Sequence, residues 1–307
     1  ATPPRVCLLG LGTMGTAMAR RLREEGNDLS VWNRTRSKAD ALVNDEAAGS
    51  CLVAATPMEA VAACAEEALV FIIFSDTAAV LSLLRDRSLG AALNGKTLAN
   101  LTSGNPDEGR EIAGVVAEIG ACDVAFVDGA YCGAPSKARA GTGQIFLSSS
   151  QADAVERWRP TFAALGTVTF CGAVGASRAL DYAVVDLFFV NLLSFMSSAA
   201  ALEREGVDLR QFIDEASRRL ATVPGALESY GRRMRSREES AYHSDVTVTL
   251  GTARNFWASR LPYNNAHGIP SDLAQFYVEL LDRAQGGVEG PDAGADISRL
   301  QETVRYG

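Results

Sequence analysis

Short apolar runs alternate with helix-like stretches along the first half of the chain. The apolar runs cover residues 6–9, 29–32, 51–54, 69–74, 97–101, 125–127, 144–148 and 168–171. Continuous hydrophobic runs are typical of strands buried on both faces of a sheet. Stretches with helical periodicity, such as 57–64 and 106–118, separate them. This alternation predicts an α/β fold with a doubly wound parallel sheet.

The pattern changes after Gly175, where one long helix is predicted over residues 177–205. Its apolar part, 182–202, is long enough to span a bilayer. Asp186 and Asn191 interrupt it, however, and carboxylates are costly inside a membrane. We therefore interpret it as a buried interdomain or subunit-interface helix, with no membrane partner.

Helices interrupted by turn residues fill the remainder of the chain, with breaks predicted at Pro224-Gly225, Pro262, 268–270 and Gly286-Gly287. The sequence thus predicts three parts: a nucleotide-binding domain over 1–174, the long helix over 175–205 and an all-helical substrate and dimerisation domain over 206–307.

A glycine-rich turn follows the first predicted strand, with Gly10, Gly12 and Gly15 in the spacing G-x-G-x-x-G. The first glycine allows the tight turn, the second lets backbone approach a pyrophosphate, and the third lets the next helix pack closely. The helix N-terminus then faces the phosphates. A tight strand-to-helix turn without a ligand gives the same spacing, but a strand, this turn, a helix and a second strand in order favour dinucleotide binding.

The residues after the second strand indicate which dinucleotide binds. NAD sites usually place a carboxylate there, whereas NADP sites place cations for the 2′-phosphate. This chain has Asn33, Arg34, Thr35 and Lys38, with no carboxylate before Asp40. Arg34 can bind a phosphate in bidentate fashion. NADPH is the expected cofactor, the alternative being a solvated basic loop.

Composition narrows the possible partners and location. The net charge of −8 and the pI near 5.0 argue against nucleic acid or an anionic membrane. The six cysteines are far apart and fit reduced thiols better than disulfides or a zinc site, so no metal is expected. The N-terminus shows no signal-peptide pattern, and we expect a cytoplasmic protein.

Three segments carry a resemblance to a known family: the Gly10–Gly15 turn, the strand end at 31–35 and the segment 100–106, Asn-Leu-Thr-Ser-Gly-Asn-Pro. They resemble the β-hydroxyacid dehydrogenase superfamily, which is 6-phosphogluconate dehydrogenase-like, and more closely its imine reductase branch. The resemblance implies a Rossmann domain, a long interdomain helix and a helical domain. It also implies a homodimer in which that helical domain interlocks with a second subunit and completes shared active sites.

Together, the sequence pattern and the resemblance predict the residues that contact the cofactor. These are Gly10, Leu11, Gly12, Thr13, Met14, Gly15, Asn33, Arg34, Thr35, Lys38, Phe74, Ser75, Asp76, Val80, Asn100, Thr102, Ser103 and Ala130. The small residues at 128–135 either form a tight turn or leave room for the nicotinamide and the substrate.

One position separates the two branches of the superfamily. Where the hydroxyacid dehydrogenases have a lysine six residues after the glycine that opens the long helix, this chain has Asp181 after Gly175. Val185 replaces their asparagine, and Cys132 replaces a substrate-binding serine. Each change removes a donor that would hold an anionic hydroxy acid.

A carboxylate at Asp181 favours a C=N substrate, because an iminium is stabilised by a negative charge and a keto acid is repelled by it. Asp181 is the predicted proton donor or iminium counter-ion, with its pKa raised by an apolar wall of Tyr182, Phe188 and Phe189. Tyr182 is the second candidate acid. A first-turn carboxylate that only meets the helix dipole is the simpler alternative.

The remainder of the predicted pocket is apolar and aromatic, with Tyr131, Phe188, Phe256 and Trp257 as candidates. Tyr242 and His243 are candidates to reach the site from a partner subunit. The predicted function is NADPH-dependent imine reduction. A reductase acting on C=O and a non-catalytic NADP-binding protein remain as alternatives.

Overall fold

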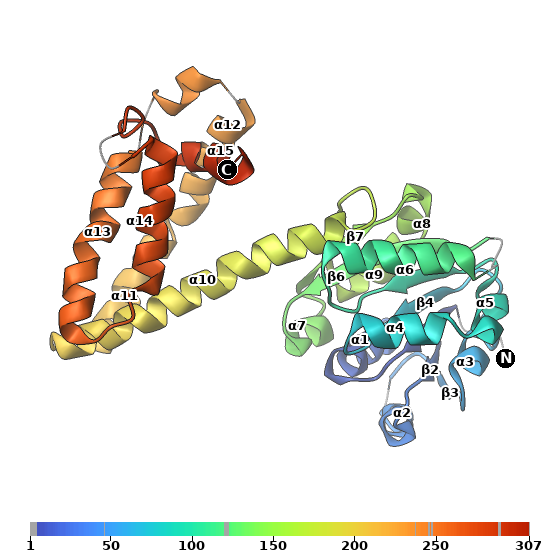
Figure 1. Cartoon of the computed structure of the whole chain (residues 1–307). Helices are drawn as coiled ribbons and strands as arrows, with labels where there is room; N and C mark the ends of the chain where they lie inside the picture. Colours follow the sequence, from blue (N-terminus) through green and yellow to red (C-terminus); the bar gives the residue numbers. More distant parts are fainter. Residues whose placement is uncertain are drawn as a thin grey trace. The chain divides into compact units, whose positions relative to one another are not determined.

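The computed structural model describes residues 5–45, 47–119, 123–236, 238–244, 246, 248–287 and 290–306. The chain forms two compact units, residues 1–189 and 190–307. The first is an α/β unit and the second is helical (Figure 1). The predicted fold class is confirmed.

An eight-stranded sheet forms the centre of the first unit, in the order β3-β2-β1-β4-β5-β6-β7-β8. Its strands are β1 (Val6–Leu9), β2 (Leu29–Trp32), β3 (Cys51–Val53), β4 (Leu69–Ile72), β5 (Thr97–Asn100), β6 (Ala125–Cys132), β7 (Gly143–Ser148) and β8 (Gly166–Phe170). All pairs among β1 to β6 are parallel. Their order reverses on either side of β1, and such a switch point is where open α/β sheets bind ligands.

The last two strands run the other way. β7 pairs with β6 in antiparallel fashion, and β8 pairs with β7 in parallel. The predicted parallel sheet therefore holds for β1 to β6 only. The connection between β6 and β7 contains only the short helix α7 (Pro135–Ala140). A parallel crossover needs a dozen or more residues, so this short connection favours an antiparallel return.

Helices cover both faces of the sheet. They are α1 (Thr13–Glu24), α2 (Arg36–Val43), α3 (Pro57–Ala62), α4 (Thr77–Leu84), α5 (Arg87–Leu93), α6 (Pro106–Glu118), α8 (Ala152–Arg157) and α9 (Arg159–Leu165). Helices α1, α2, α7, α8 and α9 contribute to one apolar cluster, and α3 to α6 contribute to the other. In β1, Val6 and Leu8 join the first cluster while Cys7 and Leu9 join the second. Both faces are thus buried, as the continuous apolar run predicts.

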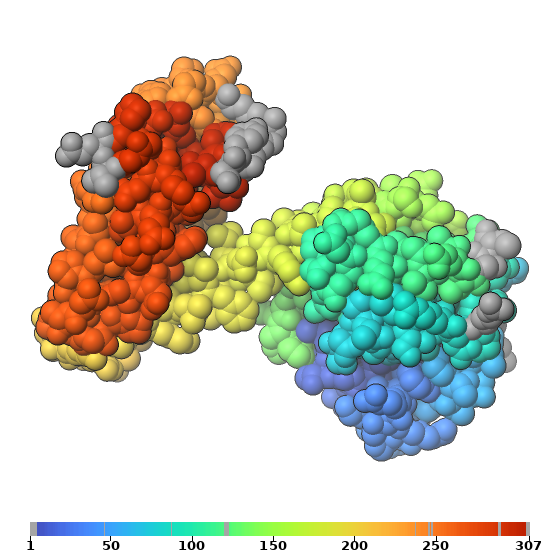
Figure 2. Space-filling model, in the orientation of Figure 1, coloured from blue at the N-terminus to red at the C-terminus, as the bar shows by residue number. Residues whose placement is uncertain are grey.

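The long helix α10 (Ala176–Arg204) begins in the first unit and ends in the second. Leu187, Phe188, Leu193 and Met196 are each at least 55% exposed in the single chain. Figure 2 shows the surface of α10 in yellow. Among the described helices it is the one whose length and composition would allow it to cross a membrane.

Helices also build the second unit, as predicted. They are α11 (Leu209–Leu220), α12 (Val223–Ser236), η1 (Glu239–Tyr242), α13 (Leu250–His267), α14 (Asp272–Gln285), η2 (Ile297–Arg299) and α15 (Leu300–Tyr306). The break predicted at Pro262 is wrong, because α13 continues through it. Contacts with α14 hold α13 on the N-terminal side of this proline: Trp257 stacks on Tyr277, and Arg254 pairs with Asp282.

Candidate functional site

The glycine turn has the geometry that a bound pyrophosphate requires. Gly10 has a φ of +105°, and a Cβ there would lie 2.2 Å from the carbonyl oxygen of Ile73. A Cβ on Gly15 would lie 2.0 Å from the carbonyl oxygen of Gly10. These two glycines are needed by the fold itself. A Cβ on Gly12 would meet no atom within 4 Å, so the open space beside it is available to a ligand.

The first turn of α1 is also suited to phosphate. Gly12 is its N-cap, no side chain caps the helix, and its first turn carries no acidic residue. Its free N–H groups and the positive end of the helix dipole therefore favour an anion. Gly12 and Thr13 are exposed and Met14 is half-buried, whereas Leu11 is buried in the core.

Asn33 supports this turn from the end of β2. Its Oδ1 accepts from the backbone N–H of Leu11 at 2.8 Å, and its Nδ2 donates to the carbonyl of Thr35 at 2.9 Å. The side chain therefore fixes the glycine turn against the basic loop. Its use in this bridge leaves 2′-phosphate binding to other residues of the loop.

The basic loop offers exposed cations for that phosphate. Arg36 pairs with Asp40 at 3.5 Å. Arg34 and Lys38 make no hydrogen bond or ion pair with any residue that the structure describes. Both are exposed, and Thr35 between them is exposed as well. Their exposed charges fit a 2′-phosphate.

Asp76 lies near Arg34 but is engaged locally. It caps α4 by accepting from Ala79 N–H at 2.8 Å, and Ser75 Oγ donates to it at 2.7 Å. The hydrogen bond from Ser75 is the main reason why the pKa of Asp76 is lowered, and the charge of Arg34 adds to the effect. Asp76 is thus an ionised helix cap at the end of β4.

Buried polar groups hold the ends of β4 and β5 together. Thr102 Oγ1 accepts from the backbone N–H of Phe74 at 2.9 Å, and Asn100 Oδ1 accepts from Thr102 N–H at 3.3 Å. Val80, Asn100, Thr102 and Ala130 are all buried, while Ser75 and Ser103 are exposed and Phe74 is half-buried. The exposed members of the predicted set can touch a ligand directly. The buried Thr102 joins the ends of β4 and β5 through its hydrogen bond from Phe74.

Asp181 lies in the second turn of α10, because the helix begins at Ala176 and its first turn carries no acidic residue. The alternative of a first-turn carboxylate is therefore wrong. Asp181 is half-buried, and its Oδ1 is buried without a hydrogen-bond partner among the described residues. Burial raises the pKa of Asp181, and the positive charge of Arg178 acts against that rise.

Cys132, at the end of β6, is within the electrostatic reach of Asp181. Burial raises the pKa of the Cys132 thiol first, and the charge of Asp181 raises it further. The start of α10 and the C-terminal part of β6 therefore lie close together. The predicted apolar wall is not formed in the single chain, where Tyr182, Phe188 and Phe189 are 47%, 59% and 55% exposed.

The other predicted pocket residues have structural roles or lie in the second unit. Tyr131 donates its hydroxyl to the carbonyl of Leu165 at 3.1 Å. Tyr242 is 2% exposed in the core of the second unit, where its hydroxyl reaches Glu302 at 3.2 Å. This burial argues against a role for Tyr242 in a partner's site. His243 and Phe256 are exposed.

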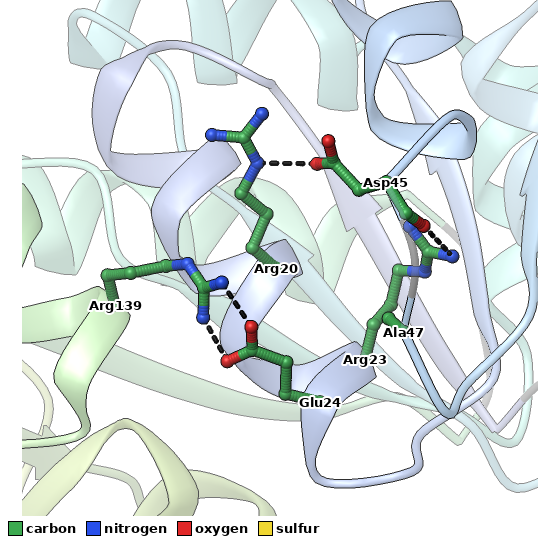
Figure 3. Close-up of a pocket in the computed structure, with 6 residues that line it drawn as sticks. All are labelled: Arg20, Arg23, Glu24, Asp45, Ala47 and Arg139. Carbon is green, nitrogen blue, oxygen red and sulfur yellow. Dashed lines mark hydrogen bonds and ion pairs between the residues drawn. The ribbon is translucent and has the colours of Figure 1, made fainter.

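A pocket of about 330 Å³ on the first unit has a different character (Figure 3). It is lined by Arg20, Arg23, Glu24, Asp45, Ala47 and Arg139. Arg20 pairs with Asp45 at 2.6 Å, and Arg139 pairs with Glu24. It lies at the C-terminal half of α1, away from the glycine turn at the other end. Among the described residues, no cluster of His, Cys, Asp and Glu has the arrangement of a metal site.

Comparisons with known proteins identify the family and the fold. Residues 5–175 match the family model described as the NAD binding domain of 6-phosphogluconate dehydrogenase. Residues 173–305 match the C-terminal domain described as NADPH-dependent reductive aminase-like.

Single proteins resemble the chain over nearly its full length. An NADPH-dependent reductive aminase of Aspergillus oryzae is 26% identical over 98% of this chain and 97% of its own. A reductive aminase from Aspergillus terreus, solved with NADPH and ethyl-5-oxohexanoate, has a TM-score of 0.83 at 27% identity, covering 99% of this chain and 100% of its own. An Aspergillus terreus imine reductase, solved with NADPH4 and dibenz[c,e]azepine, has a TM-score of 0.83 at 26% identity, covering 98% and 99%.

Proposed function

The chain belongs to the family defined by the NAD-binding domain of 6-phosphogluconate dehydrogenase, and we propose that it is an NADPH-dependent imine reductase in which Asp181 serves the substrate nitrogen. The observation that carries this role is Asp181 itself, a half-buried carboxylate beside the end of β6 whose pKa is raised by burial. The full-length likeness to reductive aminases and an imine reductase supports the reaction class.

The cofactor site follows from the glycine turn and the basic loop. The open face of Gly12 and the uncapped start of α1 hold the pyrophosphate. Arg34 and Lys38 hold the 2′-phosphate and so select NADPH over NADH. When bound, NADPH supplies the hydride that reduces the C=N carbon.

Asp181 can serve the nitrogen in two protonation states. A protonated Asp181 donates its proton to an imine, which makes the C=N carbon a better hydride acceptor. An ionised Asp181 stabilises an iminium that arrives already protonated. In both cases the carboxyl group favours a cationic nitrogen over the carboxylate of a keto acid. Tyr182 is the second candidate for the proton, since its hydroxyl lies on the next residue and its side chain is 47% exposed.

A second copy of the chain is the proposed partner of α10. Leu187, Phe188, Leu193 and Met196 are too exposed to be stable in water on a lone chain. An obligate homodimer buries such exposed apolar surface and completes the apolar part of the site. We infer a dimer rather than a membrane contact, and a cytoplasmic location in keeping with the free thiols of Cys7, Cys51, Cys64, Cys132 and Cys171. The remaining cysteine, Cys122, lies outside the described residues.

The dimer can be tested in solution. Light scattering of the purified chain should give twice the mass of 32.5 kDa. Leu193→Asp places a charge on the exposed apolar surface of α10, where Leu193 is 63% exposed, and should shift the mass towards the monomer. The matched variant Glu203→Gln, near the end of the same helix, should leave the dimer intact. A monomeric wild-type chain would refute the proposal.

The function is tested by NADPH consumption with cyclic imines, such as a pyrroline and a dihydroisoquinoline, and with keto acids in parallel. The wild-type chain should turn over the imines and not the acids. Asp181→Asn should lower kcat by about a hundredfold or more, as expected for lost acid catalysis. Tyr182→Phe is the matched control, with a much smaller effect.

Three outcomes would contradict parts of the proposal. Turnover of keto acids alone would assign the chain to C=O chemistry. Binding of NADPH without turnover of any substrate would indicate a non-catalytic protein. A large loss in Tyr182→Phe, with little loss in Asp181→Asn, would transfer the proton-donor role to Tyr182.

A further inference from the structure

A single buried carboxylate ties the start of α10 to β6. Asp128 Oδ1 accepts from Arg178 Nε at 2.8 Å, and its Oδ2 accepts from the backbone N–H of Gly175 at 3.3 Å. Ser177 Oγ donates to the backbone carbonyl of Asp128 at 3.1 Å. The side chains of Arg178 and Asp128 are 1% and 0% exposed. The first turn of α10 is therefore fixed by a buried ion pair.

The guanidinium of Arg178 is only partly used in this pair. Its Nη1 and Nη2 are buried and have no hydrogen-bond partner among the described residues. One turn further along α10, Asp181 Oδ1 is likewise buried without a partner in that part of the chain. Residues three apart on a helix are neighbours on its surface. Two carboxylates thus share the field of one guanidinium.

We propose that Arg178 is a positioning residue for the reaction: held by Asp128, it fixes the first turn of α10 and places a buried positive charge one turn before Asp181. This inference rests on the proposed role of Asp181. Arg178 does not touch the substrate in this proposal. It acts by setting how readily Asp181 holds a proton.

Anchoring alone does not account for a buried arginine. The N–H of Gly175 and the hydroxyl of Ser177 already bind Asp128, and hydrogen bonds from uncharged donors hold a helix start without desolvating a cation. A buried ion pair is often no more stabilising than apolar residues of the same size. The two unpartnered nitrogens make Arg178 more costly still. A role for its charge explains what its anchoring role does not.

The charged and titratable groups around Asp181 and Arg178 come from three elements. Arg178 lies on α10 itself, and its charge works against the rise in the pKa of Asp181 that burial causes. Cys132 and Asp128 face this region from β6. From α6, Glu108 Oε2 and Arg178 Nη1 lie 2.7 Å and 2.4 Å from the Cβ position of Gly104.

Arg110, also on α6, lies near the start of α10. Its Nη1 is 2.7 Å from the Cβ position of Gly175, and its guanidinium pairs with Asp107 at 2.6 Å. Arg178 is therefore the cation that acts directly on Asp181, while Arg110 is neutralised on its own helix.

The test compares Arg178→Gln with Arg178→Lys in the full chain. Gln removes the charge and Lys keeps it. The dependence of kcat on pH is measured with an imine substrate. The change in kcat that disappears in Asp181→Asn is assigned to the titration of Asp181. Arg178→Gln should move the pH of this change upward by about one unit, because a nearby cation no longer favours the ionised carboxylate. Arg178→Lys should leave it within a few tenths of a unit.

Asp128→Asn supplies the opposite shift. It removes the carboxylate that is hydrogen-bonded to Arg178, so the charge of Arg178 acts more strongly on Asp181. The pH at which kcat changes should therefore move downward by about one unit. Thermal unfolding and the NADPH dissociation constant identify variants that have lost their structure. If Arg178→Gln does not fold, Asp128→Asn and Arg178→Lys still decide the question. If Arg178→Gln and Asp128→Asn fold but the pH at which kcat changes stays the same, the proposal is overturned.

A second readout is independent of turnover. The carboxyl carbon of Asp181 can be titrated by ¹³C NMR in the chain without cofactor, assigned by its absence in Asp181→Asn. In each variant, the pKa of Asp181 measured in this way should shift in the same direction as the pH at which kcat changes. If the wild type reduced no imine, the proposed function would fail while this titration still tested Arg178. Normal imine turnover with an unshifted titration would refute the inference alone.

Discussion

The turn after β1 and the first turn of α10 are held in different ways. In the turn after β1, the backbone leaves room only for glycine at two positions, since a Cβ on Gly10 or Gly15 would meet a carbonyl oxygen at 2.2 Å or 2.0 Å. The first turn of α10 is held by side-chain charges instead, since Arg178 binds Asp128, which lies fifty positions earlier in the chain. The difference teaches that a nucleotide turn is specified locally, whereas the setting of a catalytic carboxylate depends on tertiary partners.

Breaking the Asp128–Arg178 pair should have the largest effect on stability. Arg178→Met leaves Asp128 buried without its counter-charge and should lower the free energy of unfolding by about 3–5 kcal/mol. The double variant Asp128→Asn/Arg178→Met should recover most of this loss. Urea unfolding measures both, followed by tryptophan fluorescence in a Trp257→Phe background so that the signal comes from Trp32 and Trp158. A loss below about 1 kcal/mol in Arg178→Met would show that the pair is not needed.

The glycines of the turn should divide into two classes. Gly15→Ala forces a Cβ against backbone and should cost about 3 kcal/mol of unfolding free energy. Gly12→Ala meets no protein atom, so stability should be unchanged while the NADPH dissociation constant rises about tenfold or more. Urea unfolding and cofactor titration together make the comparison. Equal affinity in Gly12→Ala and the wild type would place the pyrophosphate elsewhere.

The basic loop should control the choice of cofactor. Arg34→Ala removes a charge-assisted contact to the 2′-phosphate and should weaken NADPH by about tenfold or more, with NADH unaffected. Arg36→Ala is the matched control, because Arg36 already pairs with Asp40. Fluorescence titration with both dinucleotides measures the ratio. Parallel losses for NADPH and NADH would mean that Arg34 does not recognise the 2′-phosphate.

The pocket at the far end of α1 should be the least sensitive. Glu24 and Arg139 are partly exposed, at 36% and 41% of their side-chain surface. Removing such a pair usually costs less than about 1 kcal/mol. Glu24→Ala should therefore leave unfolding, NADPH binding and turnover close to those of the wild type. A change in turnover would give this pocket (Figure 3) a role that its paired charges do not suggest.

Much of the fold follows from local sequence, and the reasons are specific. Successive residues of β1 belong to the two apolar clusters in turn. The continuous apolar run therefore predicts burial on both faces from the sequence alone. The direction of β7 cannot be predicted from its apolar run, because it depends on the short connection through α7. The break predicted at Pro262 is wrong because α13 continues through this proline. Its packing on α14 through Trp257 and Arg254 is a tertiary effect that overrides the local preference.

The candidate site divides in the same way. Gly10, Gly12 and Gly15 are predictable because their spacing reflects backbone geometry. The ion pair between Arg178 and Asp128 is not predictable, because no pattern in the sequence joins two residues so far apart. Asn33 is a predicted cofactor contact, and the structure adds a bridge from Leu11 to Thr35 through its side chain, which only the folded turn reveals. These residue roles remain predictions for the experiments above.

Cys132 gives the protein a chemical reporter of its own. Its thiol is half-buried, and the negative charge of Asp181 is one of the two causes that raise its pKa. Only the thiolate reacts with alkylating reagents, so its labelling rate depends on the charge of Asp181. A cationic amine bound beside Asp181 would lower the thiol pKa and so speed the labelling of Cys132 at a fixed pH. The rate at which a small electrophile labels Cys132 in the presence of different amines therefore offers a screen for ligands that does not require turnover.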